Sequence, residues 1–101
     1  MTITKTNENG KITLALVGWL DTLSSPELGA EIEKIDAASE IILDFDKIEY
    51  IASSGLRQVV ACHRKAKELG AEFSLINVGT EPYSIFTLTG LDKKISISEK
   101  K

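Results

Sequence analysis

Five consecutive residues in the middle of the chain, Ile41-Ile42-Leu43-Asp44-Phe45, constrain the fold more than any other feature of the sequence. The run is almost continuously apolar and has the length of a β-strand, whereas a strand with one face in water would alternate apolar and polar residues. Such a strand needs cover on both faces, which parallel neighbours and crossover helices supply. We therefore expect a parallel strand that lies inside a sheet and ends at Asp46. A connector over residues 47–52 should follow this strand.

A helix is expected shortly before this strand, around Pro26. With Ser25 as N-cap, the proline takes the first helical position, where its missing N–H costs nothing. With Ser24 as N-cap, the stretch to Glu27 forms a Ser-x-x-Glu capping box instead. Both starts stay open. The residues at helical spacing that should face inward are Leu28, Ile32 and Ile35.

Two further helices are expected after the central strand. One follows Ser53-Ser54-Gly55 and ends at Gly70, and the other is capped by Thr80 and ends at Gly90. The side chains expected to face inward are Leu56, Val59, Val60, His63 and Ala66 on the first, and Ile85, Phe86 and Leu88 on the second.

Three other segments have the patterns of strands. An Asn9-Gly10 turn joins a short Thr-rich strand to a strand over residues 12–17, and further strands are expected over residues 73–76 and 95–98. The element order β-β-α-β-α-β-α-β predicts an α/β protein with one mixed sheet and helices packed against it. Since 101 residues suit one domain, we expect residues 1–101 to form a single domain.

Composition and charge exclude several classes of partner. Apolar residues make up 43% of the chain, and its one cysteine forms no internal disulfide, so a reducing cytoplasm suits it. A formal charge of -3 provides no field that attracts nucleic acid. No apolar run approaches the roughly 20 residues that span a bilayer, and neither GxGxxG nor GxxxxGK[ST] occurs. We expect a cytoplasmic protein without membrane insertion or cofactor.

Few residues support catalysis or metal binding. Cys62 and His63 are neighbours on a predicted helix, where their side chains point about 100° apart and cannot easily form a Cys–His dyad. We therefore expect an inert, partly buried thiol and, on the apolar stripe, a packed or half-buried imidazole. Asp44 and Asp46 could hold Mg²⁺ at a strand end, but a solvated strand end without metal is favoured. A hydrolase with Ser54 as nucleophile is the weakest alternative, because its only histidine lies two helical turns away. We therefore expect no enzyme.

The strongest local feature is Ser53-Ser54-Gly55-Leu56 at the expected start of a helix. Unpaired N–H groups and the helix dipole favour an anion there, so a serine at this place can carry a phosphate without breaking its helix. Arg57 lies three residues beyond Ser54 and is placed to help hold that phosphate. In the alternative interpretation one serine caps the helix and Gly55 eases the turn, and local sequence does not separate the two.

Three segments together resemble the STAS domain of bacterial anti-sigma factor antagonists. They are Gly18-x-Leu20-Asp21-Thr22, Ile41-Ile42-Leu43-Asp44 and Tyr50-Ile51-Ala52-Ser53-Ser54-Gly55-Leu56, and the resemblance covers essentially the whole chain. It implies a binding module that, when unphosphorylated, binds a serine kinase doubling as an anti-sigma factor and so frees the sigma factor. Phosphorylation of the second serine ends the binding, and a phosphatase reverses it.

Carried onto this chain, the resemblance makes Ser54 the phosphoacceptor. The residues expected to meet the partner are Asp21, Ser53, Ser54, Gly55, Leu56 and Arg57. The family commonly has Asp before the two serines, where this chain has Ala52. That departure motivates an alternative within the same fold, a STAS subunit of a transporter-associated or signalling complex that is not phosphorylated.

Overall fold

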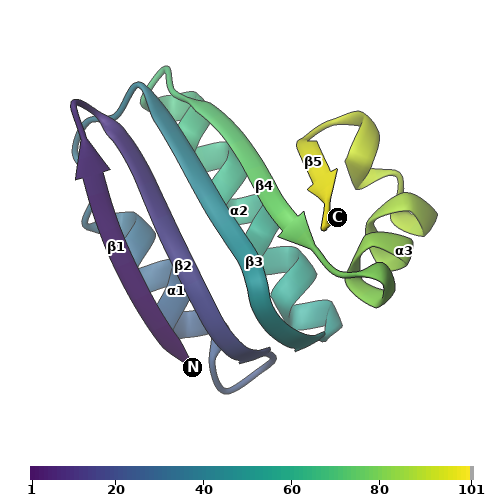
Figure 1. Ribbon diagram of the computed structural model, residues 1–101. Helices are drawn as coiled ribbons and strands as arrows, with labels where there is room; N and C mark the ends of the chain where they lie inside the picture. The colour runs from purple at the N-terminus through teal and green to yellow at the C-terminus, as the bar shows by residue number, and fades with distance from the viewer. Residues whose placement is uncertain (101) are drawn as a thin grey trace.

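A five-stranded sheet forms the centre of the protein in a computed structural model that describes residues 1–100 (Figure 1). The strands lie side by side in chain order: β1 (Thr2–Glu8), β2 (Lys11–Leu20), β3 (Glu40–Ile51), β4 (Glu72–Val78) and β5 (Ser96–Glu99). β1 is antiparallel to β2, and the remaining neighbours pair in parallel. The mixed α/β sheet expected from the sequence is confirmed.

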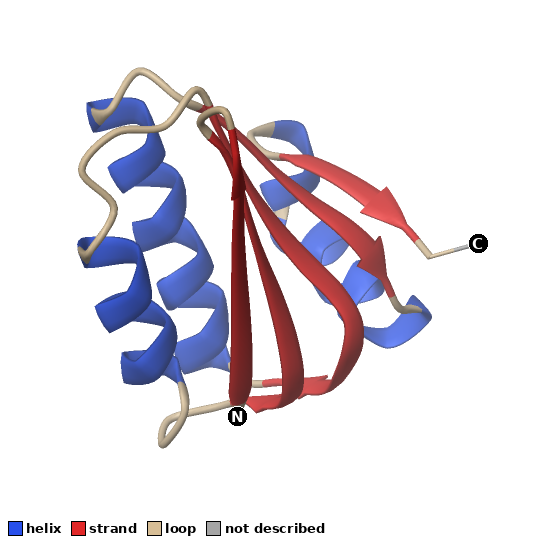
Figure 2. Cartoon of the chain, turned by 60° about the vertical axis from the view of Figure 1, so that its left-hand side comes forward, coloured by secondary structure: helices blue, strands red, loops and turns tan. Residues whose placement is uncertain are grey.

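Helices cover the sheet unevenly. Their bounds are Ser25–Glu33 for α1, Ser53–Glu68 for α2, Thr80–Thr89 for α3 and Leu91–Lys93 for the 3₁₀ helix η1. Figure 2 shows α1 and α2 together on one side of the sheet and α3 on the other, near β5. In residues 1–100, no helix combines the length and apolar character that crossing a bilayer requires.

The first hairpin forms as its sequence predicts. Asn9 and Gly10 both have positive φ angles, 55° and 92°, which the tight Asn-Gly turn requires. Beyond the turn, Ile12, Leu14 and Leu16 are buried at alternate positions of β2. The hairpin therefore places β2 inside the sheet, between β1 and β3.

β3 is longer than the sequence predicted. The expected end at Asp46 and the expected connector over residues 47–52 are wrong, because pairing with β2 continues to Leu20 opposite Ile51 after two register shifts. In this added part Ile48 is buried, but the residues around it are mostly polar and exposed, so no apolar run marks the strand. The longer β3 brings the start of α2 beside the end of β2.

The start of α1 confirms Ser24 at the N-cap position but not the capping box expected with it. Ser24 occupies the N-cap position, but its side chain makes no capping hydrogen bond, so both Ser25 as N-cap and the capping box with Glu27 are wrong. The Ser24 hydroxyl instead accepts a hydrogen bond from the Asp21 N–H in the loop and donates one to the Trp19 carbonyl near the end of β2. The helix ends at Glu33, and Ile35 is buried just beyond it.

The start and one inward-facing residue of α3 also differ from expectation. Gly79 is the N-cap and Thr80 is already helical, so the predicted Thr80 cap is wrong. Phe86 is buried and packs edge-on against Phe45, with 6.0 Å between ring centroids. Leu88, expected to face inward, is 86% exposed. Because one face of this short helix meets the sheet, only part of its apolar sequence is covered.

The inner face of α2 is turned slightly from the predicted stripe. Its buried residues are Gly55, Val59, Cys62 and Ala66, whereas Leu56, Val60 and His63 are half-buried. His63 stacks on Phe73 of β4, with ring centroids 5.6 Å apart. The packed, half-buried imidazole predicted from the sequence is confirmed, and the Cys62 thiol, predicted to be partly buried, is fully buried.

Candidate functional site

The ends of β2 and β3 bring two distant segments together. Leu20 and Ile51 are opposite each other in the parallel pairing, and the Ala52 N–H donates to the Leu20 carbonyl at 2.9 Å. The carboxyl ends of adjacent parallel strands meet at one edge of a sheet, where α/β proteins often bind ligands. Here that edge carries the loop from Asp21 to Ser24 and the first turn of α2.

Gly55 allows α2 to begin this close to β2. A Cβ atom at this position would lie 2.6 Å from the Leu20 carbonyl oxygen and 2.9 Å from Cγ1 of Ile51. Both distances are shorter than van der Waals contact. Any side chain at residue 55 would therefore force the start of α2 away from the β2 end, and with it Ser54.

Ser54 contacts the loop after β2 through its hydroxyl. Its Oγ lies 3.2 Å from Oγ1 of Thr22, and either atom can donate the hydrogen bond. Ser54 is half-buried and Ser53 is exposed, both in the first turn of α2. Thr22 was not singled out from the sequence, although it belongs to the Leu-Asp-Thr stretch. No local signal reveals a contact that depends on the pairing of β2 with β3.

Neither serine caps α2. The N-cap residue is Ala52, in an extended conformation with φ -98° and ψ 174°, and no side chain caps the helix. The capping interpretation of Ser53 and Ser54 is therefore wrong. The first turn also has no acidic residue. N–H groups at a helix start have no partner within the helix and carry the positive end of its dipole. The Ser54 hydroxyl thus lies where an added anion is stabilised.

Asp21 organises the loop beside Ser54. Its Oδ1 accepts hydrogen bonds from the N–H groups of Leu23 and Ser24, both at 3.0 Å, while the Asp21 N–H donates to Oγ of Ser24 at 2.9 Å. The hydrogen bonds to Oδ1, first of all the one from the Ser24 backbone, hold the pKa of the Asp21 carboxyl below its usual value. The ionised carboxylate therefore stabilises the loop that presents Thr22.

Two aromatic residues stand exposed at the same end of the sheet. Trp19 and Tyr50 are partners in the β2–β3 pairing, 54% and 47% exposed, with ring centroids 5.4 Å apart. The indole N–H donates to the Glu49 carboxylate at 3.2 Å. Exposed Trp and Tyr side chains are typical of protein–protein contact surfaces. The sequence interpretation did not select either residue as a contact residue, although both lie within segments that carry the family resemblance.

The residues that enzymes would use are placed apart. His63 lies nine positions after Ser54 along α2, a rise of about 13.5 Å, so this imidazole cannot serve Ser54 as a base. Burial raises the pKa of the Cys62 thiol to about 12. Asp44 accepts a hydrogen bond from the Asn77 amide and Asp46 pairs with Lys100 at 3.0 Å. Within residues 1–100, no group of three or more potential metal ligands comes together.

Comparison with known proteins assigns the chain to a family. The model of the STAS domain matches residues 2–101, and the protein therefore belongs to the STAS domain family. The anti-sigma-B factor antagonist of Bacillus subtilis is 28% identical over 97 residues, which cover 95% of this chain and 88% of that protein. The family resemblance noted in the sequence is confirmed.

Solved structures show the same fold. An anti-sigma factor antagonist from Mycobacterium paratuberculosis superposes with a TM-score of 0.86 at 23% identity, covering 96% of this chain and 84% of that one. The Bacillus protein SpoIIAA, at 20% identity, has been solved unphosphorylated (TM-score 0.79, covering 95% of this chain and 87% of that one) and phosphorylated (TM-score 0.76, 95% and 90%).

Proposed function

We propose that this protein is an anti-sigma factor antagonist that acts in the cytoplasm as one STAS domain over residues 1–101. Unphosphorylated, it binds a serine kinase that doubles as an anti-sigma factor, and phosphorylation of Ser54 ends that binding. The observation that carries the proposal is the Ser54 hydroxyl, which lies in the uncapped first turn of α2 beside Thr22. The names of its relatives, and the phosphorylated form of SpoIIAA, support it.

The position of Ser54 suits a switch that changes charge without changing fold. A phosphoryl group adds about -1.5 to -2 charges and three acceptor oxygens, which the N–H groups and dipole of the α2 start stabilise. Arg57, one turn along, adds a positive charge to the same end of the helix. The rest of the proposed contact surface, formed by Asp21, Ser53, Gly55 and Leu56, keeps its place. A partner that fits the small hydroxyl would meet a dianion instead.

The first experiment locates the modification. The protein is incubated with ATP and the serine kinase encoded nearest to it, and the phosphate is mapped by mass spectrometry. We expect phosphate on Ser54 in the wild type and in Ser53→Ala, and none in Ser54→Ala. Ser53→Ala is the matched control, because it removes the neighbouring and more exposed hydroxyl. Phosphate on Ser53, or on neither serine, contradicts the proposal.

A second experiment tests the consequence for binding. The affinity for the same kinase is measured by calorimetry with unmodified protein, phosphoprotein and Ser54→Asp. We expect at least a tenfold loss for the phosphoprotein, a smaller loss for the singly charged Asp variant, and recovery after phosphatase treatment. Equal affinities of the unmodified protein and the phosphoprotein would mean that phosphorylation does not control kinase binding, and would refute the proposed switch.

Ala52 favours one alternative within the same fold. Its methyl group precedes the two serines at the N-cap of α2 and offers a kinase no charge to recognise. The alternative is a STAS subunit of a transporter-associated or signalling complex that is never phosphorylated. Co-purification with an ABC-type ATPase, together with no phosphate on Ser54, favours this function. Co-purification with a lone soluble kinase favours the switch.

A further inference from the structure

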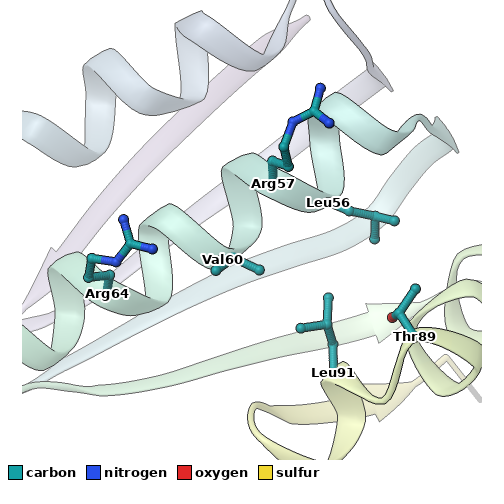
Figure 3. Close-up of a pocket in the computed structure, with 6 residues that line it drawn as sticks. All are labelled: Leu56, Arg57, Val60, Arg64, Thr89 and Leu91. Atoms are coloured by element: carbon teal, nitrogen blue, oxygen red, sulfur yellow. The ribbon is translucent and has the colours of Figure 1, made fainter.

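A groove with an apolar floor runs between α2 and η1. It has a volume of about 460 Å³, and three half-buried apolar side chains line it: Leu56 and Val60 from α2, and Leu91 from η1 (Figure 3). Thr89 lies at its edge, but the Thr89 hydroxyl already donates within α3, to the Ile85 carbonyl at 2.9 Å. The floor therefore offers a partner apolar contact and little hydrogen bonding.

The rim of this groove carries two arginines without acidic partners. Arg57 and Arg64 are exposed, and Figure 3 shows both guanidinium groups extending from the same side of α2. No carboxylate of residues 1–100 lies within 4 Å of either group. Lys65 of the same helix, by contrast, pairs with Glu33 at 3.8 Å. On a chain of net charge -3, this rim is a local cationic site beside an apolar floor.

The spacing of the two arginines matches that of a helix laid along the groove. They are seven residues apart, almost two helical turns, which is a separation of about 10.5 Å along the axis with only about 20° of rotation. Carboxylates at positions i and i+7 of another helix have the same spacing, and residues i+3 and i+4 lie between them on the same face. Guanidinium and carboxylate groups pair by two parallel hydrogen bonds, so both ends can be held at once.

We propose that the groove between α2 and η1 binds an acidic amphipathic helix of a partner protein. Two carboxylates of that helix pair with Arg57 and Arg64, and the apolar residues between them pack on Leu56, Val60 and Leu91. This is the arrangement of a helix in a groove, with charge complementarity setting its position. The binding requires no phosphate on Ser54 and does not rest on the proposed switch, although the groove shares Leu56 and Arg57 with the contact surface proposed there.

The test uses the whole ¹⁵N-labelled protein and two synthetic helical peptides. The first peptide carries Glu at positions i and i+7 and Leu at i+3 and i+4, and the control has Lys in place of both Glu residues. We expect the first peptide to shift the amide resonances of Leu56, Val60 and Leu91 most strongly and to bind at least tenfold more tightly than the control. No binding, shifts at another face, or equal affinity of the two peptides would overturn the proposal.

Charge-reversed variants distinguish binding in the groove from attraction by the overall charge of the protein. Arg57→Glu with Arg64→Glu should lower affinity for the acidic peptide at least tenfold, because attraction at both ends becomes repulsion. Lys47→Glu with Lys67→Glu reverses the same number of exposed charges away from the groove. This pair should lower the affinity for the acidic peptide less than threefold. Equal losses contradict a specific site. Octanoate is the third probe, and saturation of the groove by this small carboxylate with none by the peptide also overturns the proposal.

Discussion

Replacing Gly55 with alanine should destabilise the protein, because the new Cβ atom would clash with its neighbours. The new Cβ would lie 2.6 Å from the Leu20 carbonyl oxygen, which belongs to the β2 backbone, and 2.9 Å from Ile51 of the core. The carbonyl cannot move without disturbing the β2–β3 pairing, and the Ile51 side chain is buried in the core. Overpacking of this kind costs up to about 3 kcal/mol, and the better helix propensity of alanine offsets about 1 kcal/mol. We expect a net loss of about 2 kcal/mol, or roughly 8–16 °C in Tm for a domain of this size.

Gly29→Ala is the matched control, because Gly29 is also helical but meets only a flexible side chain. Its Cβ would approach the Gln58 amide at 3.0–3.2 Å, and that side chain can turn away. Stability should stay unchanged or rise by up to about 1 kcal/mol. Thermal and urea unfolding followed by circular dichroism measure both variants. If Gly55→Ala is as stable as the wild type, or if both variants shift Tm equally, the close approach of α2 to β2 does not constrain residue 55.

Three further predictions test burial and ionisation. The Cys62 thiol, buried and with its pKa raised to about 12, should resist Ellman's reagent in the folded protein and react fully in denaturant. Phe86→Ala should cost about 3–5 kcal/mol, whereas the exposed Leu88→Ala should change stability by less than about 0.5 kcal/mol in the same unfolding assay. Because the pKa of Asp21 is lowered in the fold, its stabilising effect is complete above the unfolded value of 3.8 and is lost as pH falls through the folded value. Unfolding measured from neutral to acid pH should therefore show a steeper loss of Tm in the wild type than in Asp21→Asn.

Local signals were sufficient for much of the fold. The Asn9-Gly10 turn, the apolar run from Ile41 to Phe45 and the helix stop at Gly90 each depend on the conformation or burial of a few consecutive residues. A tight turn or a buried strand of a few residues has the same sequence preferences in different proteins. The class and order of the elements therefore follow from the sequence.

Features that depend on pairing between distant segments could not be predicted from the sequence. The extension of β3 to Ile51 is stabilised by its ladder with β2, although its own residues alternate poorly. Leu88 is apolar and helical, yet only the placement of α3 on the sheet determines that it faces solvent. Thr22 meets Ser54 across 32 residues of sequence, and that contact exists only because the two strands end together.

The same dependence explains how the candidate switch is held in place. The Leu20 carbonyl accepts the Ala52 N–H and also lies against Gly55, so a single backbone group sets both the direction of the chain entering α2 and its distance from β2. Ser54 lies between these two contacts, and its hydroxyl is therefore fixed beside Thr22 by backbone geometry and not by the hydrogen bond to Thr22 alone. Added phosphate can displace that one hydrogen bond without disturbing the strand pairing beneath it. A rigid helix start with a replaceable side-chain contact is what a charge switch without refolding requires.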